Sequence, residues 1–212
     1  DGAPGAIFFF IFLTGIACPA VTGALPAADS TANVWSKVPE LLARLAPPTF
    51  PDREFVITRF GATGDGHPDC TAAFQKAIDA CQRAGGGKVV VPPGIFLTGA
   101  IHLKDNVNLC VETNATIRFS ANPADYLPVV FTRYEGTEVM NYSPFIYAFE
   151  QTNIAVTGGG TIDGQGDTAV WHDWKSYGDP KQLVALAARG VPVAKRIFGA
   201  GHHLRPNFIE PV

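Results

Sequence analysis

Three basic side chains in the second half of the sequence are candidates for substrate binding. They are Arg133, His202 and Arg205. An arginine guanidinium matches the geometry of a carboxylate and can form two parallel hydrogen bonds with it, and a histidine at the rim of a site can bond to hydroxyl groups. The pattern favours a ligand with carboxylate and hydroxyl groups. The alternatives are an ion pair of Arg133 with Glu135 or Glu138 and a surface position for His202.

Two carboxylates lie close together in the segment DGQGD, at Asp163 and Asp167. Such a pair could act as general acid and base, or supply oxygen ligands to calcium. Two carboxylates are too few ligands for a calcium site, and an aspartate in a glycine-rich turn commonly accepts hydrogen bonds from nearby backbone amides. We therefore interpret the segment as a turn with Asp163 bonded to local amides. No catalytic residue and no metal ligand is assigned.

Aromatic and histidine residues near the C-terminal end allow two interpretations. Trp171 and Trp174 could form a platform on which a sugar stacks, but packing beneath a loop is the commoner use of tryptophan. His202 and His203 are adjacent, so their side chains should diverge if the segment is extended. A shared metal site is therefore not expected.

Composition bounds the class of protein. The chain has 212 residues, of which 47% are hydrophobic and 17% charged, so it can form a sizeable core and is not wholly disordered. The 22 glycines and 17 prolines favour a protein rich in turns and strands. The net charge of -3, with no basic stripe in the sequence, gives no reason to expect nucleic acid as a partner.

Residues 1–28 resemble a secretory signal, with the apolar run AIFFFIFL followed by small residues. An N-terminal membrane anchor is the alternative. The signal predicts a secreted or periplasmic protein whose mature chain has no stable membrane insertion, and we expect a monomer. Residues 29–53 are predicted to be a linker or N-terminal arm with a short helix over Val38–Leu45, and residues 54–212 a single domain.

Cysteine spacing argues against one disulfide. Cys18 lies in the signal-like segment, which leaves Cys70, Cys81 and Cys110. Cys81 follows Cys70 by 11 residues along a predicted helix, so the two lie about 16 Å apart, too far for a disulfide. We interpret all three as small buried hydrophobes. A bridge between Cys81 and Cys110 remains an alternative.

The elements that would hold these side chains begin with one strand, a helix and a series of short strands. Residues 55–57 are apolar, glycines follow, and a helix after Asp69, capped by Asp69 or Thr71, is predicted from one apolar face. That face contains Ala73, Phe74, Ala77, Ile78 and Cys81. Short β-branched segments then cover 88–91, 95–97, 100–103, 107–111 and 116–119.

An internal echo indicates that the strands stack into a solenoid. Asn106-Val-Asn-Leu is echoed 47 residues later by Asn153-Ile-Ala-Val, with a predicted insertion between them at about 122–143. The helix would then cover the first coil, whose open end exposes unpaired backbone. A β-sandwich is the alternative. The insertion is predicted to be a long binding loop, residues 182–189 a helix, and the final apolar residues a strand.

Five segments of this sequence carry a family resemblance. They are FGATGDG from Phe60, DCTAAFQKAI from Asp69, DYLPVVFTRYEG from Asp125, GTIDGQG from Gly160 and LRPNFI from Leu204. The chain resembles the polygalacturonase-like glycoside hydrolases (glycoside hydrolase family 28) of the pectin-lyase-like superfamily. The resemblance implies an all-β, right-handed parallel β-helix with an N-terminal capping α-helix, here truncated at its C-terminus. It also implies inverting hydrolysis of α-1,4-galacturonosyl bonds in pectin or a related polyuronide, with no cofactor.

The family's signature motifs are absent from this sequence. Asn-Thr-Asp, Asp-Asp, Gly-His-Gly and Arg-Ile-Lys do not occur, and Gly201-His202-His203 and Arg196-Ile197-Phe198 match only in part. We expect this part of the protein to be inactive by itself. Two alternatives remain. One is a calcium-dependent enzyme like pectate lyase, and the other is a non-catalytic carbohydrate-binding or tailspike-like β-helix.

Overall fold

The computed structural model describes residues 34–167 and 169–212, so the signal-like segment 1–28 lies outside the described residues. The chain divides into two compact units, Asp1–Ala46 and Pro47–Val212. The described part of the first unit contains the 3₁₀ helix η1 (Val34–Lys37) and the helix α1 (Val38–Arg44). This agrees with the helix predicted from residue 38. None of the described helices is long and apolar enough to cross a membrane.

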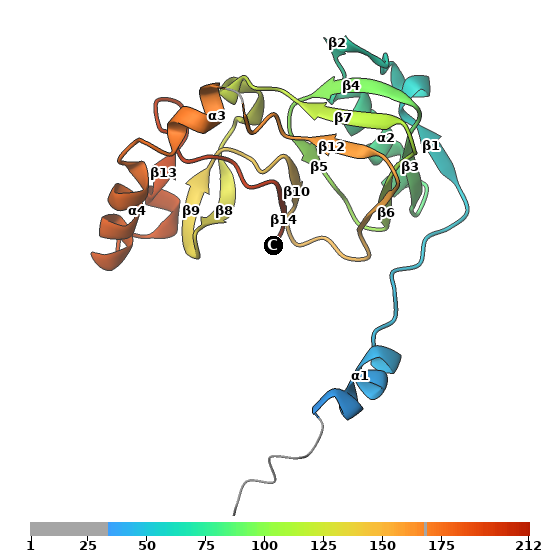
Figure 1. Cartoon of the computed structure of the whole chain (residues 1–212), viewed down its shortest axis with the longest axis horizontal. Helices are drawn as coiled ribbons and strands as arrows, with labels where there is room; N and C mark the ends of the chain where they lie inside the picture. Colours follow the sequence, from blue (N-terminus) through green and yellow to red (C-terminus); the bar gives the residue numbers. More distant parts are fainter. Residues whose placement is uncertain (1–33, 168) are drawn as a thin grey trace, which may run out of the picture. The chain divides into compact units, whose positions relative to one another are not determined.

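The second unit is a coil whose strands form three parallel sheets (Figure 1). Sheet A contains β1 (Glu54–Val56), β3 (Gly87–Val91), β6 (Val107–Val111) and β11 (Ala155–Gly158). Sheet B contains β2 (Asp65–Asp69), β4 (Gly94–Thr98), β7 (Ala115–Phe119) and β12 (Thr161–Asp163). Sheet C contains β5 (Ile101–His102), β10 (Ile146–Ala148) and β14 (Ile209–Pro211). The predicted parallel β-helix is confirmed, and the sandwich alternative is wrong because strands adjacent within each of these sheets run parallel.

The first coil closes with a helix in place of a strand. Residues after β1 form the 3₁₀ helix η2 (Ile57–Phe60), and β2 leads into α2 (Thr71–Arg83), which occupies the place that β5 takes in the second coil. All five residues of its predicted apolar face are buried. The predicted cap is only partly correct. The N-cap position is Cys70, while the Asp69 carboxylate accepts the Thr71 backbone N–H at 2.9 Å.

The core of the coil consists of inward-facing side chains stacked from one coil to the next. Val89 pairs in register with Leu109, and Leu109 with Val156. Phe96 and Ile117 pair in the same way in sheet B. Val89, Leu109 and Ile117 are fully buried. Because successive side chains of a strand point to opposite faces, residues two positions apart, such as Val89 and Val91, point into this interior together, and both are fully buried.

Two insertions leave the coil between sheet B and sheet C. The third coil contributes the 3₁₀ helix η3 (Pro123–Tyr126) and a hairpin of β8 (Val130–Tyr134) and β9 (Thr137–Asn141). The fourth coil contributes α3 (Ala169–Trp174), α4 (Asp179–Ala188), the 3₁₀ helix η4 (Val193–Lys195) and β13 (Ile197–Phe198). The helix predicted at 182–189 and the final strand are therefore present.

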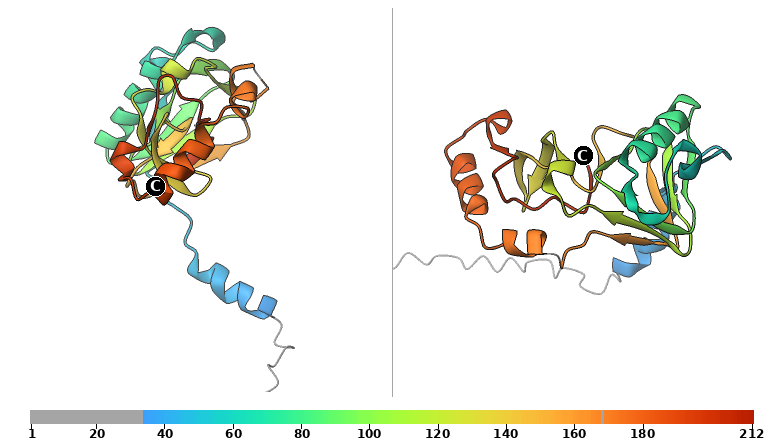
Figure 2. Two further views of the ribbon diagram at one scale, coloured as in Figure 1. Left: turned by 90° about the vertical axis from the view of Figure 1, so that its left-hand side faces the viewer. Right: turned by 90° about the horizontal axis from the view of Figure 1, so that it is seen from above.

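The two insertions form one structure, which we call the side lobe: the β8–β9 hairpin together with residues 169–204. Strand β13 pairs parallel with β9 across the two insertions. A small separate core joins them, made of Val139, Leu183, Phe198 and Leu204. The side lobe lies on one side of the coil (Figure 2, right).

The hairpin was not predicted within the loop at 122–143. Its two-residue turn is Glu135-Gly136, with φ of 48° and 84°. Two left-handed residues in succession are typical of the tight turns that connect antiparallel strands. The sequence signal was present, since alternating β-forming residues flank Glu-Gly on both sides. The turn was not recognised because its first residue is glutamate, whereas asparagine or aspartate usually precedes the glycine in such turns.

Candidate functional site

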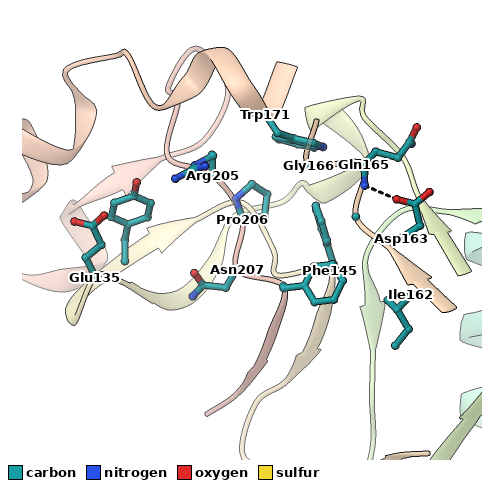
Figure 3. A pocket seen from close by; sticks show the side chains of 13 residues that line it. Glu135, Phe145, Ile162, Asp163, Gln165, Gly166, Trp171, Arg205, Pro206 and Asn207 are labelled. Carbon is teal, nitrogen blue, oxygen red and sulfur yellow. Dashed lines mark hydrogen bonds between the residues drawn. The ribbon is translucent and has the colours of Figure 1, made fainter. Parts of the chain in front are cut away.

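A pocket of about 540 Å³ lies where the side lobe meets the coil. Its lining comes from five places in the chain: the hairpin tip Tyr134–Glu135, Phe145 before β10, the segment Ile162–Gly166, Trp171 of α3 and the segment Arg205–Phe208. Figure 3 shows Glu135 on one side of the pocket, Asp163 and Gln165 on the other, and Arg205, Pro206 and Asn207 between them. Residues far apart in the sequence therefore face one cavity.

The turn after β12 forms one wall. The Asp163 carboxylate accepts the Gln165 backbone N–H at 2.9 Å, and Arg118 lies 3.4 Å from the other carboxylate oxygen. The Gln165 side-chain amide donates to the carbonyl of Phe119 at 2.5 Å, which attaches the turn to sheet B. This geometry agrees with the interpretation of Asp163 as a turn residue. Asp167 is exposed and does not line the pocket.

Aromatic rings form the apolar part of the lining. Phe145 stacks on Phe119 with ring centroids 4.9 Å apart and contacts Phe208 at 5.7 Å and Trp171 at 5.8 Å. Trp171 and Trp174 are both buried and belong to the main core together with Phe145, so they pack as core residues between the side lobe and the coil. Trp171 also lines the pocket, and its Nε1 has no hydrogen-bond partner among the described residues. That nitrogen is buried, so within the described part of the chain it is a donor without a partner inside the packing and not a group that faces the cavity.

Of the three predicted binding residues, only Arg205 lines the pocket. It is exposed and forms no ion pair with any residue that the structure describes. Glu135 is exposed at the hairpin tip, on the side of the pocket away from Asp163 (Figure 3). The pocket therefore offers one unpaired guanidinium beside aromatic rings and backbone, an arrangement that suits a ligand with a carboxylate and an apolar face.

Arg133 and His202 have other partners. The guanidinium of Arg133 lies 3.3 Å from Glu138, which is one of the two ion pairs considered from the sequence. His202 Nδ1 lies 2.9 Å from a carboxylate oxygen of Asp179, the first residue of α4. Neither side chain lines the pocket. The structure thus brings one of the three predicted residues to this site.

His202 and His203 do not diverge, because the extended backbone on which that expectation depended is not present. The backbone of His203 donates to Asp179 at 2.6 Å, and His203 Nδ1 lies 3.3 Å from the same carboxylate that bonds His202. The chain is not extended here, because His202 N–H bonds back to the carbonyl of Gly199 in a turn. Burial disfavours the charged form of Asp179, but the hydrogen bonds from the two histidines outweigh it and hold the pKa below its ordinary value.

The cysteines form no bridge among the described residues. Cys70, Cys81 and Cys110 are all free, so the Cys81–Cys110 alternative is not formed. Cys70 and Cys81 are buried as predicted, whereas Cys110 is half-buried. Burial raises the pKa of the Cys81 thiol to about 11, which keeps it protonated and unreactive at neutral pH.

Three comparisons with known proteins agree with this architecture. The sequence profile described as "Rhamnogalacturonase A/epimerase, pectate lyase-like" matches residues 55–178. The chain belongs to this family. It is 37% identical over 133 residues to an exo-poly-α-D-galacturonosidase of Dickeya chrysanthemi, and 32% identical over 130 residues to a probable polygalacturonase of Vitis vinifera. The crystal structure of a hyperthermoactive exopolygalacturonase from Thermotoga maritima superposes on this member of the family with a TM-score of 0.75 and 44% sequence identity.

These relatives are longer than the chain. The Dickeya match covers 59% of this family member and 20% of the relative, and the Vitis match covers 57% and 26%. The Thermotoga structure covers 82% of the chain, which in turn covers 41% of that structure. The chain thus spans about a fifth to two fifths of the relatives that it matches.

Proposed function

We propose that the protein is a glycoside hydrolase of the polygalacturonase type. Its reaction is the inverting hydrolysis of α-1,4-galacturonosyl bonds in pectin or a related polyuronide. The observation that carries the proposal is the likeness to the Thermotoga maritima exopolygalacturonase. The superposition covers 82% of the chain, so it is not confined to the coil and also includes residues of the side lobe.

The proposed role of the pocket is to bind a galacturonate residue. The Arg205 guanidinium is exposed at its wall and has no ion-pair partner within 34–167 and 169–212, so it would pair with the sugar carboxylate. The ring of Phe208, which is also exposed, offers a face against which the apolar side of the sugar can pack. Arg133 and His202 remain proposed contributors only at the rim, because their side chains already bond Glu138 and Asp179.

The described residues are proposed to bind substrate and not to cleave it. Inverting hydrolysis needs two carboxyl groups about 6.5–9.5 Å apart. Glu135 and Asp163 line the pocket, but Asp163 is engaged by Gln165 and Arg118, so we assign neither as a catalytic acid. We further propose that the enzyme is secreted or periplasmic, that it is monomeric, and that it uses no cofactor.

Binding by this chain tests the role of the pocket. Calorimetric titration with digalacturonate should show saturable binding, and the neutral disaccharide of galactose should bind more weakly. Arg205→Gln should weaken digalacturonate binding about tenfold, or about 1.4 kcal/mol, because one charge-assisted pair is lost. Arg59→Gln is the matched control, since Arg59 is exposed on η2 and does not line the pocket. Equal affinity for the charged and neutral disaccharides would contradict the assignment.

Activity of the full-length gene product tests the reaction. Incubation with polygalacturonate should release reducing sugar without an ultraviolet-absorbing unsaturated product, and a calcium chelator should not change the rate. Release of an unsaturated product that depends on calcium would select the lyase alternative. Binding without any cleavage would select the carbohydrate-binding alternative.

A further inference from the structure

Glu210, on the last strand of sheet C, bonds to the β8–β9 hairpin of the side lobe. Its Oε1 accepts the backbone N–H of Arg133 at 2.9 Å. Its Oε2 accepts the hydroxyl of Thr132 and the side-chain amide of Asn207, the latter at 2.6 Å. Thr132 is buried and Glu210 is half-buried, so these bonds are partly shielded from water. Three donors therefore converge on one carboxylate.

Asn207 completes the contact from the same segment of the coil. Its amide nitrogen also donates to the backbone carbonyl of Arg133 at 2.7 Å. Both backbone hydrogen-bonding groups of Arg133 are thus taken by side chains of residues 207 and 210. Two residues earlier, the carbonyl of Phe131 accepts the hydroxyl of Tyr147 from β10 at 2.6 Å. Side chains of sheet C, together with Asn207 just before β14, therefore bond to the outer edge of β8 where a neighbouring strand would otherwise pair.

We propose that Glu210 is a positioning residue that holds the hairpin as one wall of the pocket, a role that rests on the proposed saccharide-binding function of that pocket. Thr132 and Arg133 directly precede Tyr134 and Glu135 at the hairpin tip, and these last two line the pocket. Asn207 lines the pocket itself. The clamp formed by Glu210 thus connects the hairpin wall to the segment that carries Arg205.

The chemistry of the clamp requires a carboxylate and not an amide. The Arg133 N–H, the Asn207 amide nitrogen and the Thr132 hydroxyl all act as donors toward Glu210. An ionised carboxylate is an acceptor only, whereas a glutamine would place its own N–H₂ group against one of these donors. Glu210→Gln therefore changes the hydrogen-bonding pattern while it keeps the size of the side chain.

The test compares Glu210→Gln with Glu138→Gln in the whole chain. Glu138 lies on the same hairpin, and among the described residues its side chain pairs with the exposed guanidinium of Arg133 alone, so it matches the change in charge without touching the clamp. Hydrogen exchange of peptides covering 130–141 reports the hairpin, and titration with digalacturonate reports the pocket. Thermal unfolding reports the fold of the coil. Thr132→Val, which removes one donor and keeps the shape, is the milder second variant.

Glu210→Gln should raise amide exchange in the hairpin at least tenfold and weaken digalacturonate binding at least fivefold, while exchange in the coil strands β3 and β6 stays unchanged. Thr132→Val should give the same pattern with smaller effects, and Glu138→Gln should leave exchange and affinity as in the wild type. Unchanged exchange in both clamp variants would overturn the proposal, as would faster exchange with unchanged affinity. If the wild type binds no uronide, the proposed function of the pocket fails, and the exchange data alone decide whether Glu210 holds the hairpin.

Discussion

Asn153 and Asn106 occupy equivalent places in successive coils, and the side-chain amide of Asn153 donates to the side-chain oxygen of Asn106 at 2.9 Å. Both residues have left-handed backbone conformations, with φ of 51° and 62°. In the coil below, the same place is taken by Gly86, with φ of 101°. A Cβ on Gly86 would lie 2.6 Å from the Cβ of Asn106. The turn into sheet A thus repeats one strained conformation, which asparagine and glycine tolerate.

Substitutions at Asn153 separate the conformation of this turn from its hydrogen bonds. Asn153→Ala loses the bond to Asn106 and the bond to the carbonyl of Thr49, and it places an alanine in the left-handed region. We expect a loss of about 2 kcal/mol in the free energy of unfolding. Asn153→Gly loses the same bonds, but glycine adopts the left-handed conformation without strain. The free energy of unfolding should therefore fall by only about 1 kcal/mol. Urea denaturation measures both, and equal losses would show that the conformation contributes nothing.

The reactivity of the thiols should follow their burial. With iodoacetamide at pH 8, the native protein should be modified at Cys110 and not at Cys70 or Cys81, because burial raises the pKa values of the last two thiols and blocks access. In urea all three should react. Peptide mass spectrometry identifies the modified sites. Rapid native labelling of Cys81 would show that α2 does not stay packed on the coil.

Acid should weaken the contact between α4 and the two histidines. The folded-state pKa of Asp179 is lowered, so its contribution to stability is complete above the unfolded pKa of about 3.9 and is lost as the pH falls through the lower folded pKa. Asp179→Asn should cost about 1–3 kcal/mol at pH 7, since bonds to a charged acceptor are lost. Thermal unfolding from pH 7 to pH 2.5 measures this. The variant should lose less stability than the wild type below pH 4, and parallel curves would be the contrary result.

Substitution by alanine at two glycines of the pocket wall should have different effects on stability and on binding. A Cβ on Gly164 would lie 2.6 Å from the ring of Phe208 and 2.8 Å from that of Phe145, whereas a Cβ on Gly166 would meet nothing within 4 Å. Gly164→Ala should therefore displace the rings, cost about 1–3 kcal/mol and weaken digalacturonate binding. Gly166→Ala should change neither stability nor affinity appreciably. Calorimetry of unfolding and of binding measures both, and equal behaviour of the two variants would contradict the packing of the pocket.

The sequence by itself determined the strand-rich class and the stacking hypothesis. Short apolar strands, glycine-rich turns and the echo between Asn106 and Asn153 indicated stacked coils but left a β-sandwich open, and the family resemblance selected the β-helix. The apolar face of α2 was read in the same way, from spacing within 13 residues. The candidate site was less predictable. Arg205 was found by its chemistry, and Tyr134 lies in the predicted binding loop, but Phe145 and Asn207 were not singled out, because nothing near them in the sequence distinguishes residues that line a pocket from residues that fill a core.

Only the tertiary structure decided how the two insertions combine. Strand β13 pairs with β9, His202 and His203 converge on Asp179, and Glu210 bonds Thr132 across 78 positions in the sequence. In each of these contacts, the sequence around one residue gives no sign of the residue that it will meet. Periodicity reports which face of a strand or helix is apolar, but it carries no information on which distant polar group will lie opposite. That information arises only when parallel stacking brings the third and fourth coils into register and places their insertions side by side.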